Sequence, residues 1–237
     1  MIPEKRARLI YDNLEKVKNK IEQAAVRSGR NPAEIELIIV TKTWYSEIIA
    51  LVIEKGIRQL GENRIQEALP KIEQLEKKYK NLSWHMIGHL QSNKARKAVE
   101  NFKMIQSVDS FKIARRISEI AAEMNKTADI LIEINISQEA SKYGVQPTEV
   151  MPLAEKVMSL PGIQLRGLMT IGPLTADADT IRRAFQKTRQ YYEELRQNIP
   201  GKINTLSMGM SDDYETAIEE GTTMVRIGRA VFGTRRN

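Results

Sequence analysis

The chain contains no cysteine among its 237 residues, which excludes a disulfide framework and a thiol nucleophile. Aromatic residues make up only 5% of the sequence, so few rings are present on which nucleic-acid bases could stack. No run of eighteen apolar residues occurs, and the sequence therefore predicts no membrane-spanning helix. The first residues, Met1–Arg6, are not followed by the apolar core of a secretory signal. We therefore expect a soluble, cytoplasmic protein that binds neither nucleic acid nor a membrane.

The residues that are present are typical of a globular protein, with 41% hydrophobic and 28% charged side chains. The formal net charge is +7, but basic residues are interleaved with acidic ones, as in Glu73–Lys78. This interleaving disfavours a nucleic-acid interface, whereas the positive balance suits a small ligand that carries phosphate. The length is sufficient for one large α/β barrel.

Regular alternation of strand and helix patterns follows an amphipathic first helix that ends near Ser28–Pro32. The apolar stripe of this helix consists of Ile10, Leu14, Val17, Ile21 and Ala24. The predicted strands are Ile35–Val40, Ile57–Gly61, Ser83–Ile87, Met104–Ser107, Ile130–Ile136, Leu165–Thr170, Thr205–Met208 and Met224–Ile227. The predicted helices between them are Ser46–Lys55, Ile65–Tyr79, Ser92–Glu100, Phe111–Met124, Pro147–Ser159, Asp177–Gln197 and Asp213–Glu220.

Strands that alternate with helices favour a parallel sheet, and eight such units favour closure of the sheet into a barrel. No linker or low-complexity segment interrupts the pattern. We therefore predict an α/β fold in which residues 1–237 form a single (β/α)8 TIM-type barrel with an extra amino-terminal helix. A closed barrel leaves no sheet edge free for pairing, so we expect a monomer.

Lys42 stands just beyond the first predicted strand, at the end of an apolar run. One interpretation is a solvated lysine past a strand end, and the position alone favours it. The other is an amine at the edge of a dry interior. Desolvation there disfavours the ammonium form and leaves a nucleophile suited to Schiff-base chemistry with an aldehyde.

Two further groups of residues follow the last two predicted strands. Gly209 and Ser211 lie between a strand and a helix. Glycine lets a ligand approach the backbone, and Ser211 can cap the helix beside N–H groups that attract an anion, or act as a plain cap. In the eighth strand, alternation turns Arg226 away from its apolar neighbours and toward the barrel mouth. Gly228 adds a backbone amide near the same place, where barrels often bind phosphate.

The carboxyl ends of parallel strands share one face of a barrel, so Lys42, Arg226, Ser211 and Gly228 are expected to lie on one rim. Together these residues suit a ligand with an aldehyde, a flat ring and a phosphate. Lys42 would take the aldehyde, Arg226 the ring, and Ser211 with Gly228 the phosphate. Pyridoxal 5′-phosphate has all three features.

Several stretches of the sequence resemble the pyridoxal phosphate homeostasis protein family, from about residue 35 to the end. The stretches Trp84–Lys94 and Leu206–Asp213 are the most specific parts of the resemblance. The other matching stretches are Val40–Thr43, Gly61–Asn63, Gln66–Glu67, Glu133–Ile136, Ser141–Gly144, Arg166–Met169 and Thr223–Gly228.

The resemblance implies a barrel similar to the amino-terminal domain of alanine racemase, with an internal aldimine at Lys42. It also implies that Ser211 and the Gly228 region hold the phosphate. Arg226 would face the pyridine nitrogen, and Asn63 would line the pocket. These roles are carried over from the family to the matching positions of this sequence.

Two residues of the eighth unit bear on the chemistry. Arg229 departs from the family pattern, which has a small residue there, usually threonine. Phosphate binding through the backbone is unaffected by this change, but a hydroxyl contact at this position is in doubt. Arg226 can only donate hydrogen bonds, so a ring nitrogen opposite it should stay unprotonated and should stabilise carbanions weakly. This disfavours transaminase-like reactions.

We therefore expect a protein of vitamin B6 homeostasis that holds pyridoxal phosphate as an aldimine on Lys42 and supplies it to PLP-dependent apoenzymes. The alternative is a PLP-dependent amino-acid racemase. Racemisation needs a proton carrier on each face of the ring. In alanine racemase-like proteins the second carrier is a tyrosine from an added β domain. The sequence ends at Asn237, directly after the eighth strand, so we expect a binding protein rather than an enzyme.

Three other features have ordinary interpretations. His85 and His89 are four residues apart but not on a helix, and the glutamate of the zincin pattern is missing, so no metal site is expected. Lys142 is either a loop lysine or a second amine that helps to move the cofactor on and off. Glu133 and Asn135 are expected to face the barrel interior beside the site.

Overall fold

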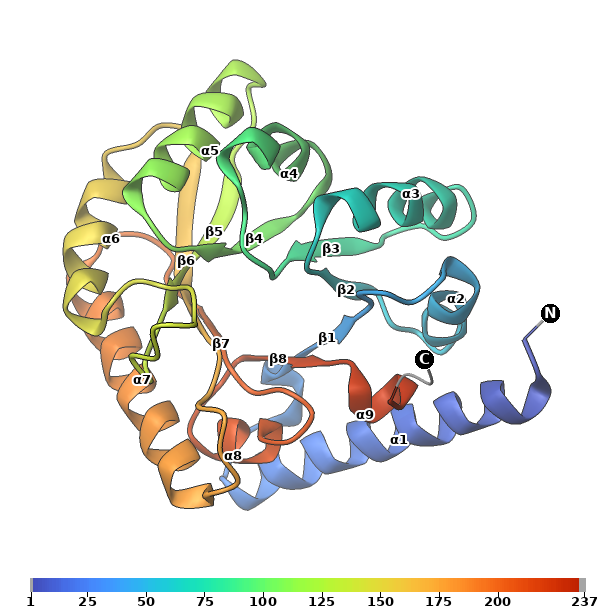
Figure 1. Ribbon diagram of the computed structural model, residues 1–237. Helices are drawn as coiled ribbons and strands as arrows, with labels where there is room; N and C mark the ends of the chain where they lie inside the picture. Colours follow the sequence, from blue (N-terminus) through green and yellow to red (C-terminus); the bar gives the residue numbers. More distant parts are fainter. Residues whose placement is uncertain (1, 235–237) are drawn as a thin grey trace.

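Eight parallel strands close into a barrel in chain order, and β8 pairs with β1 to complete it (Figure 1). The computed structural model describes residues 2–234. The strands are β1 Glu36–Val40, β2 Gln59–Glu62, β3 Ser83–Met86, β4 Met104–Val108, β5 Ala128–Ile134, β6 Ile163–Thr170, β7 Thr205–Ser207 and β8 Met224–Ile227. The α-helices are α1 Glu4–Arg27, α2 Ser46–Glu54, α3 Ile65–Glu76, α4 Ala95–Asn101, α5 Phe111–Glu123, α6 Val150–Met158, α7 Ala178–Asn198, α8 Tyr214–Glu219 and α9 Arg229–Phe232.

The predicted barrel and the predicted order of its elements are confirmed, with small shifts at element ends. The helices predicted to start at Ser92 and Pro147 begin instead as 3₁₀ turns, Ser92–Lys94 and Pro147–Glu149. The short helix α9 was not predicted, because a single turn is too short to show an apolar period. Among residues 2–234, no helix combines the length and the apolar character needed to cross a bilayer.

The strands are buried on both faces, which explains their largely apolar sequences. The outer face packs on the helices. The inner face carries a separate apolar cluster made of Ile38, Met104, Leu131, Met169 and Met224. Val225 and Ile227 belong to the outer core, so Arg226 between them faces the interior on the same side as Met224. The predicted inward direction of Arg226 is confirmed.

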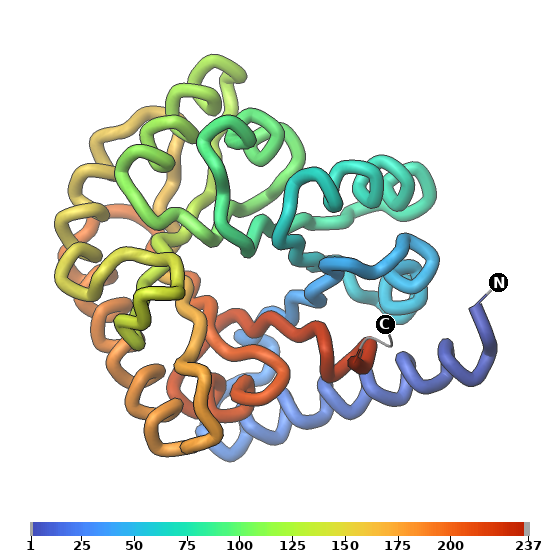
Figure 2. Tube along the Cα trace, in the orientation of Figure 1, coloured from blue at the N-terminus to red at the C-terminus, as the bar shows by residue number. Residues whose placement is uncertain are grey.

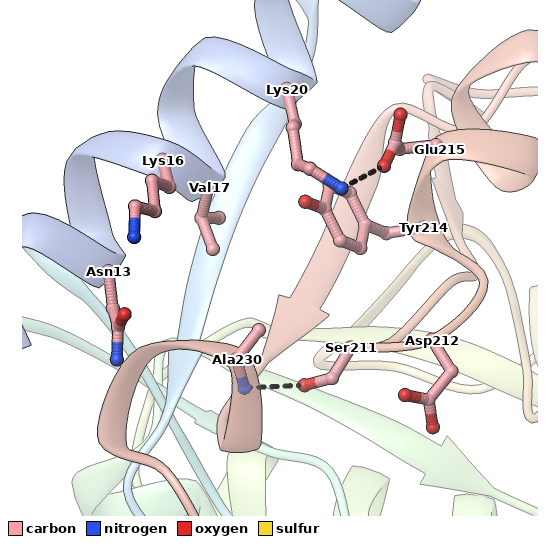
Figure 3. A pocket seen from close by; sticks show the side chains of 9 residues that line it. All are labelled: Asn13, Lys16, Val17, Lys20, Ser211, Asp212, Tyr214, Glu215 and Ala230. Carbon is pink, nitrogen blue, oxygen red and sulfur yellow. Dashed lines mark hydrogen bonds and ion pairs between the residues drawn. The ribbon is translucent and has the colours of Figure 1, made fainter.

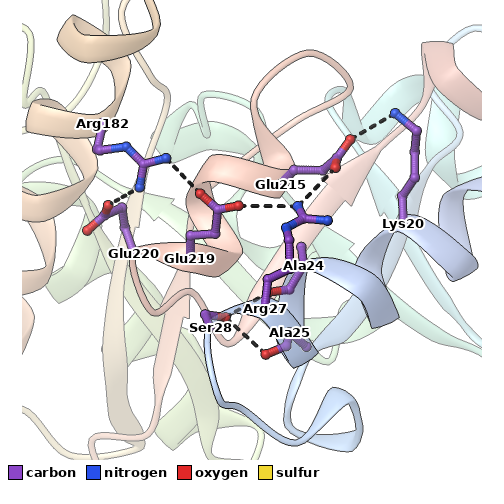
Figure 4. Close-up of polar contacts among 9 residues, drawn as sticks. All are labelled: Lys20, Ala24, Ala25, Arg27, Ser28, Arg182, Glu215, Glu219 and Glu220. Carbon is purple, nitrogen blue, oxygen red and sulfur yellow. Dashed lines mark hydrogen bonds and ion pairs between the residues drawn. The ribbon is translucent and has the colours of Figure 1, made fainter.

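The extra amino-terminal helix α1 lies along the outside of the barrel beside α8 and α9, so the first helix packs against the last two (Figure 2). Its buried residues are Ile10, Leu14, Val17, Ile21, Ala24 and Ala25. Lys20 pairs with Glu215 of α8 at 2.8 Å, and Arg27 bridges Glu215 and Glu219 (Figure 4). These ion pairs are largely exposed, so the apolar face supplies most of the stabilisation.

Gly167 lies at an irregularity in the pairing of β5 with β6. The register shifts where Leu131 pairs with Gly167, and Arg166 is the extra residue of a β-bulge. Gly167 has a φ of 149°, and a Cβ atom there would overlap the carbonyl oxygen of Thr205 on β7. The strand therefore passes β7 at a distance that only glycine allows.

We predict that Gly167→Ala lowers the free energy of unfolding by about 2–4 kcal/mol, since the added methyl group must displace the Thr205 backbone. Gly201→Ala is the matched control. Its φ of 116° is also positive, but no atom lies within 4 Å of an added Cβ. Urea unfolding measures both variants. An equal loss of stability in the two would contradict the close approach of β6 to β7.

Candidate functional site

Lys42 lies in the turn between β1 and α2, just past the point at which burial ends. Val40 and Thr41 are buried, whereas the Lys42 side chain is exposed. Within residues 2–234 its amine makes no hydrogen bond and no ion pair. The interpretation of Lys42 as an amine at a dry edge is therefore wrong, and the residue is solvated. Its lack of a partner leaves the amine available to a ligand.

The backbone immediately before Lys42 is held through all the polar groups of Thr41. The Thr41 N–H donates to the Gly61 carbonyl at 2.9 Å, and its hydroxyl donates to Glu62 Oε1 at 2.7 Å. Lys71 Nζ donates to the Thr41 carbonyl at 2.9 Å and to Glu62 Oε1 at 2.7 Å. Thr41, Glu62 and Lys71 form what we call the Thr41 clamp.

Glu62 is the acidic member of the Thr41 clamp and is fully buried, as is Thr41. Burial raises the pKa of the Glu62 carboxyl, and the hydrogen bonds from Lys71 and Thr41 act in the opposite direction. Sequence reasoning missed the clamp. A glutamate at the end of a buried strand was a usable sign, but its partner Lys71 comes from the following helix α3 and no spacing rule identifies it.

Asn63 follows β2 on the same rim, and its role in lining a pocket stays a prediction. Its Oδ1 atom is buried and has no hydrogen-bond partner in the described part of the chain, and the same is true of Glu62 Oε2. Gly88, after β3, lies so close that a Cβ atom would come within 2.8 Å of the Asn63 Cα. Unpaired buried oxygens are costly, so they indicate a place where a ligand or a water molecule donates.

Arg226 is 4% exposed and lies inside the barrel near the carboxyl end of β8. Its NH1 group donates to Ser207 Oγ at 2.6 Å, and its NH2 group donates to the Thr170 carbonyl at 2.7 Å. Burial lowers the pKa of Arg226 to about 10, an effect that the charges of Asp213 and Glu133 oppose. The guanidinium therefore stays charged at neutral pH, held by two uncharged oxygen atoms.

Ser211 and Gly228 lie in the loops after β7 and β8. The Ser211 hydroxyl accepts a hydrogen bond from the Ala230 N–H at 3.1 Å and so links the two loops (Figure 3). The expectation that Ser211 caps the next helix is wrong, because α8 begins at Tyr214 and Asp213 occupies the N-cap position. The Asp213 carboxylate makes no capping hydrogen bond to α8 and accepts instead from the Met210 N–H of the preceding loop.

The same two loops leave backbone donors free. The N–H groups of Ser211, Asp212 and Gly228 have no hydrogen-bond acceptor within residues 2–234. Arg229 forms an ion pair with Asp212, so its side chain contacts the Ser211 loop. The residue that departs from the family pattern therefore ties the two loops together.

A cavity of about 380 Å³ opens on the outer side of the Ser211 loop, against α1 (Figure 3). Lys16 and Lys20 of α1 line it with Ser211, but Lys42 and Arg226 do not. The cavity therefore shares Ser211 with the predicted site but includes neither its lysine nor its arginine. At the predicted site, a Cβ atom at Gly228 would lie 3.2 Å from the Val40 carbonyl oxygen, so the loop after β8 adjoins the end of β1.

Glu133 and Asn135 are both buried, and Glu133 faces the interior two residues after Leu131, as predicted. The pKa of Glu133 is raised to about 7, chiefly by burial and also by the nearby Asp109, while Arg226 acts in the opposite direction. Asn135 lies past the end of β5, where its Nδ2 donates to the carbonyl of Glu139 in the same loop at 2.9 Å.

The loop after β5 is tied to its neighbours by several contacts. His89 Nδ1 lies 2.9 Å from Asp109 Oδ2, and the His89 ring stacks on Tyr143 with centroids 4.0 Å apart. Lys142 Nζ donates to Glu139 Oε1 at 2.6 Å and to the Gly172 carbonyl at 2.9 Å. Its amine is engaged, which favours the loop-lysine interpretation.

No group of three or more His, Asp or Glu side chains in residues 2–234 could hold a metal ion.

Comparisons with known sequences agree with this architecture. Residues 12–236 match the family of the alanine racemase N-terminal domain. The pyridoxal phosphate homeostasis protein of Escherichia coli strain K12 is 44% identical over 230 residues, which cover 95% of this chain and 97% of that protein. The protein of the same name from Pasteurella multocida is 42% identical over 227 residues, with 95% and 97% coverage.

Solved structures share the fold. An unknown protein from Bifidobacterium adolescentis superposes with a TM-score of 0.90 at 37% identity, covering 98% of each chain. PipY of Synechococcus elongatus, solved with PLP bound, gives 0.80 at 36% identity and covers 90% of this chain and 100% of its own. Alanine racemase from Corynebacterium glutamicum gives 0.73 at 16% identity, and this chain covers 62% of it, so that likeness shows the fold alone.

The raised pKa of Glu133 generates a prediction about stability. The folded protein keeps a proton near pH 7 that the unfolded chain, with an ordinary pKa of 4.5, has released. The stability that this proton contributes is therefore complete below pH 4.5 and is lost as the pH rises through 7. We predict that Glu133→Gln, which stays neutral, is more stable than wild type at pH 8 by about 1–3 kcal/mol.

Urea unfolding at pH 5 and pH 8 measures this effect, and the advantage of Glu133→Gln should shrink at the lower pH. The exposed residue Glu155 provides the control variant Glu155→Gln, which should differ little from wild type at either pH. An advantage of Glu133→Gln that is the same at both pH values would contradict a buried, protonated Glu133.

Proposed function

This chain belongs to the pyridoxal phosphate homeostasis protein family, and we propose that it binds pyridoxal 5′-phosphate at the rim formed by the carboxyl ends of its strands. The observation that carries the proposal is the order of β7, β8 and β1, which are consecutive neighbours in the barrel. They are followed by Ser211, by Gly228 beside the inward Arg226, and by Lys42. The PLP-bound structure of PipY, at 36% identity, supports the same ligand for this chain.

The residues present fit the three parts of this cofactor. The unpartnered amine of Lys42 suits the aldehyde. The free N–H groups at Ser211 and Gly228 suit the phosphate, since successive loop amides form an anion-binding concavity. Arg226 suits an unprotonated ring nitrogen, because a guanidinium can only donate hydrogen bonds. Asn63, whose buried Oδ1 lacks a partner within residues 2–234, would line the pocket.

Pyridoxal phosphate supplies an aldehyde that condenses reversibly with amines. In the proposed complex the Lys42 amine bonds to the aldehyde carbon, and one water molecule is released. The Thr41 clamp holds the backbone from which Lys42 extends. Less conformational entropy is therefore lost when the Lys42 side chain is fixed against the aldehyde. Because Lys42 is exposed, water and competing amines can reach it, which suits a protein that loads and unloads its ligand.

Arg226 also favours supply over catalysis. It gives no proton to a ring nitrogen, and a neutral ring stabilises a carbanion weakly. We therefore propose a role in vitamin B6 homeostasis, in which the protein holds the cofactor and passes it to PLP-dependent apoenzymes in the cytoplasm. The closed barrel has no free sheet edge, which supports a monomer with residues 1–237 as one domain.

The loaded protein should be yellow, and borohydride should attach the cofactor irreversibly to Lys42. Reduction turns the C=N bond into a C–N bond that survives digestion, so peptide mass spectrometry locates it. Lys42→Ala should lose the adduct and keep its urea stability within about 0.5 kcal/mol, because the side chain is exposed. The exposed control Lys112→Ala should keep the adduct. An adduct on a different lysine of the wild-type protein would refute the assignment.

Loaded protein should reactivate a PLP-dependent apoenzyme without turning over amino acids itself. Chiral chromatography of single L-amino acids incubated with the loaded protein should show D-isomers only at the level of the Lys42→Ala control. Sustained racemisation that the control lacks would support the racemase alternative instead. Failure to reactivate any apoenzyme, with the cofactor still bound, would argue against supply.

A further inference from the structure

A row of hydrogen-bonded side chains crosses the barrel interior below Arg226. The Ser207 hydroxyl, which accepts from Arg226, donates to Gln106 Oε1 at 2.7 Å. Gln106 Nε2 lies 3.1 Å from His85 Nδ1, and His85 Nε2 lies 2.9 Å from Gln59 Oε1. These residues come from β8, β7, β4, β3 and β2, so the row spans the barrel.

The row is buried among apolar side chains. Gln106 and Ser207 are 0% exposed and His85 is 1% exposed, although the same interior holds the apolar cluster around Leu131 and Met169. Buried polar groups are costly unless each one is paired. The polar residues at these positions are therefore explained by their hydrogen bonds to the groups at the two ends of the row. These groups are the guanidinium of Arg226 and the side chain of Gln59.

Arg226 determines the direction of every hydrogen bond in the row. A guanidinium cannot accept, so Ser207 must accept from it and must place its own hydrogen on Gln106 Oε1. The amide nitrogen of Gln106 then faces His85 Nδ1, which must accept. The hydrogen of the neutral ring is thus on Nε2 and points at Gln59 Oε1. The reverse direction would leave the Ser207 hydrogen without an acceptor.

The opposite end of the row agrees with this direction. Gln59 uses its oxygen for His85 and hydrogen-bonds through its side chain to the carboxyl of Glu36, an acceptor when ionised. Burial lowers the pKa of His85 to about 3, with a smaller contribution from Lys103, so the ring stays neutral. A neutral imidazole ring carries its single N–H hydrogen on either Nδ1 or Nε2. It is therefore compatible with only one of the two opposite orientations of the hydrogen bonds in the row.

We propose that Ser207, Gln106 and His85 are positioning residues that hold the Arg226 guanidinium in one orientation, and that Arg226 in turn sets the Nε2–H tautomer of His85. The tautomer stands independently of any ligand. The consequence for the cofactor rests on the proposed function: a guanidinium held in this way presents the same donors to the ring nitrogen at all times.

The first test needs no cofactor. The sequence has two histidines, so the ring nitrogens of His85 in ¹⁵N-labelled protein can be assigned with the variant His89→Gln. Wild type at pH 7 should carry the His85 hydrogen on Nε2. In Gln106→Glu the carboxylate can only accept, and the hydrogen should move to Nδ1. Met169→Leu, an interior change outside the row, should leave the tautomer unchanged.

The wild-type spectrum decides the outcome even where Gln106→Glu fails to fold. A His85 hydrogen on Nδ1, or an equal mixture of the two tautomers, would overturn the proposal, and so would a folded Gln106→Glu variant that keeps Nε2–H.

The second test uses protein loaded with pyridoxal phosphate. Ser207→Ala removes one acceptor of Arg226 and should shift the absorption maximum of the bound cofactor and weaken its binding about tenfold, the effect of about one hydrogen bond. Met169→Leu should change neither. Unchanged absorption and affinity in Ser207→Ala would overturn the positioning role. Absence of binding by wild type would refute the proposed function instead, and the tautomer prediction would be unaffected.

Discussion

The burial of one guanidinium inside an apolar barrel is the constraint on which the polar interior depends. A buried charge is tolerated only when its hydrogen bonds are satisfied, and within residues 2–234 no carboxylate forms an ion pair with Arg226. Its charge is therefore held by the Thr170 carbonyl and the Ser207 hydroxyl. Ser207 needs an acceptor of its own, which brings in Gln106, and Gln106 needs His85. One inward-facing residue on β8 thus accounts for buried polar side chains on three other strands.

The two ends of the proposed site differ in rigidity, and the difference matters for function. Arg226 is buried and fixed by two hydrogen bonds, so its remaining donors can recognise a ring only in one orientation. Lys42 is exposed and unpaired within residues 2–234, while the Thr41 clamp holds only its backbone. Catalytic lysines gain reactivity from desolvation. A solvated lysine beside a rigid recognition element suits reversible capture of an aldehyde better than turnover.

Periodic features could be predicted from the sequence, and contacts between distant segments could not. Alternation along β8 was enough to turn Arg226 inward, because neighbouring apolar residues must face the helices. The exposure of Lys42 depends on the loops packed around the end of β1. It therefore cannot be predicted from the sequence pattern around this residue. Gln106 and Ser207 are 101 residues apart in sequence, so their hydrogen bond cannot be predicted from the sequence of either strand. Asp213, rather than Ser211, occupies the N-cap position of α8, because the loop continues two residues beyond Ser211 before the helix begins.

The charges at the barrel mouth are distributed unevenly, and this gives a phosphate-bearing ligand one orientation. The free N–H groups at Ser211 and Gly228 follow β7 and β8, next to Arg226. Across the barrel, the acidic side chains of Asp109 and Glu133 come from the β4 and β5 side, and Asp109 raises the pKa of Glu133. A dianionic phosphate is repelled from that side and attracted to the β7–β8 side. An aldehyde on the same molecule is then directed toward β1, where Lys42 is the amine without a partner in residues 2–234.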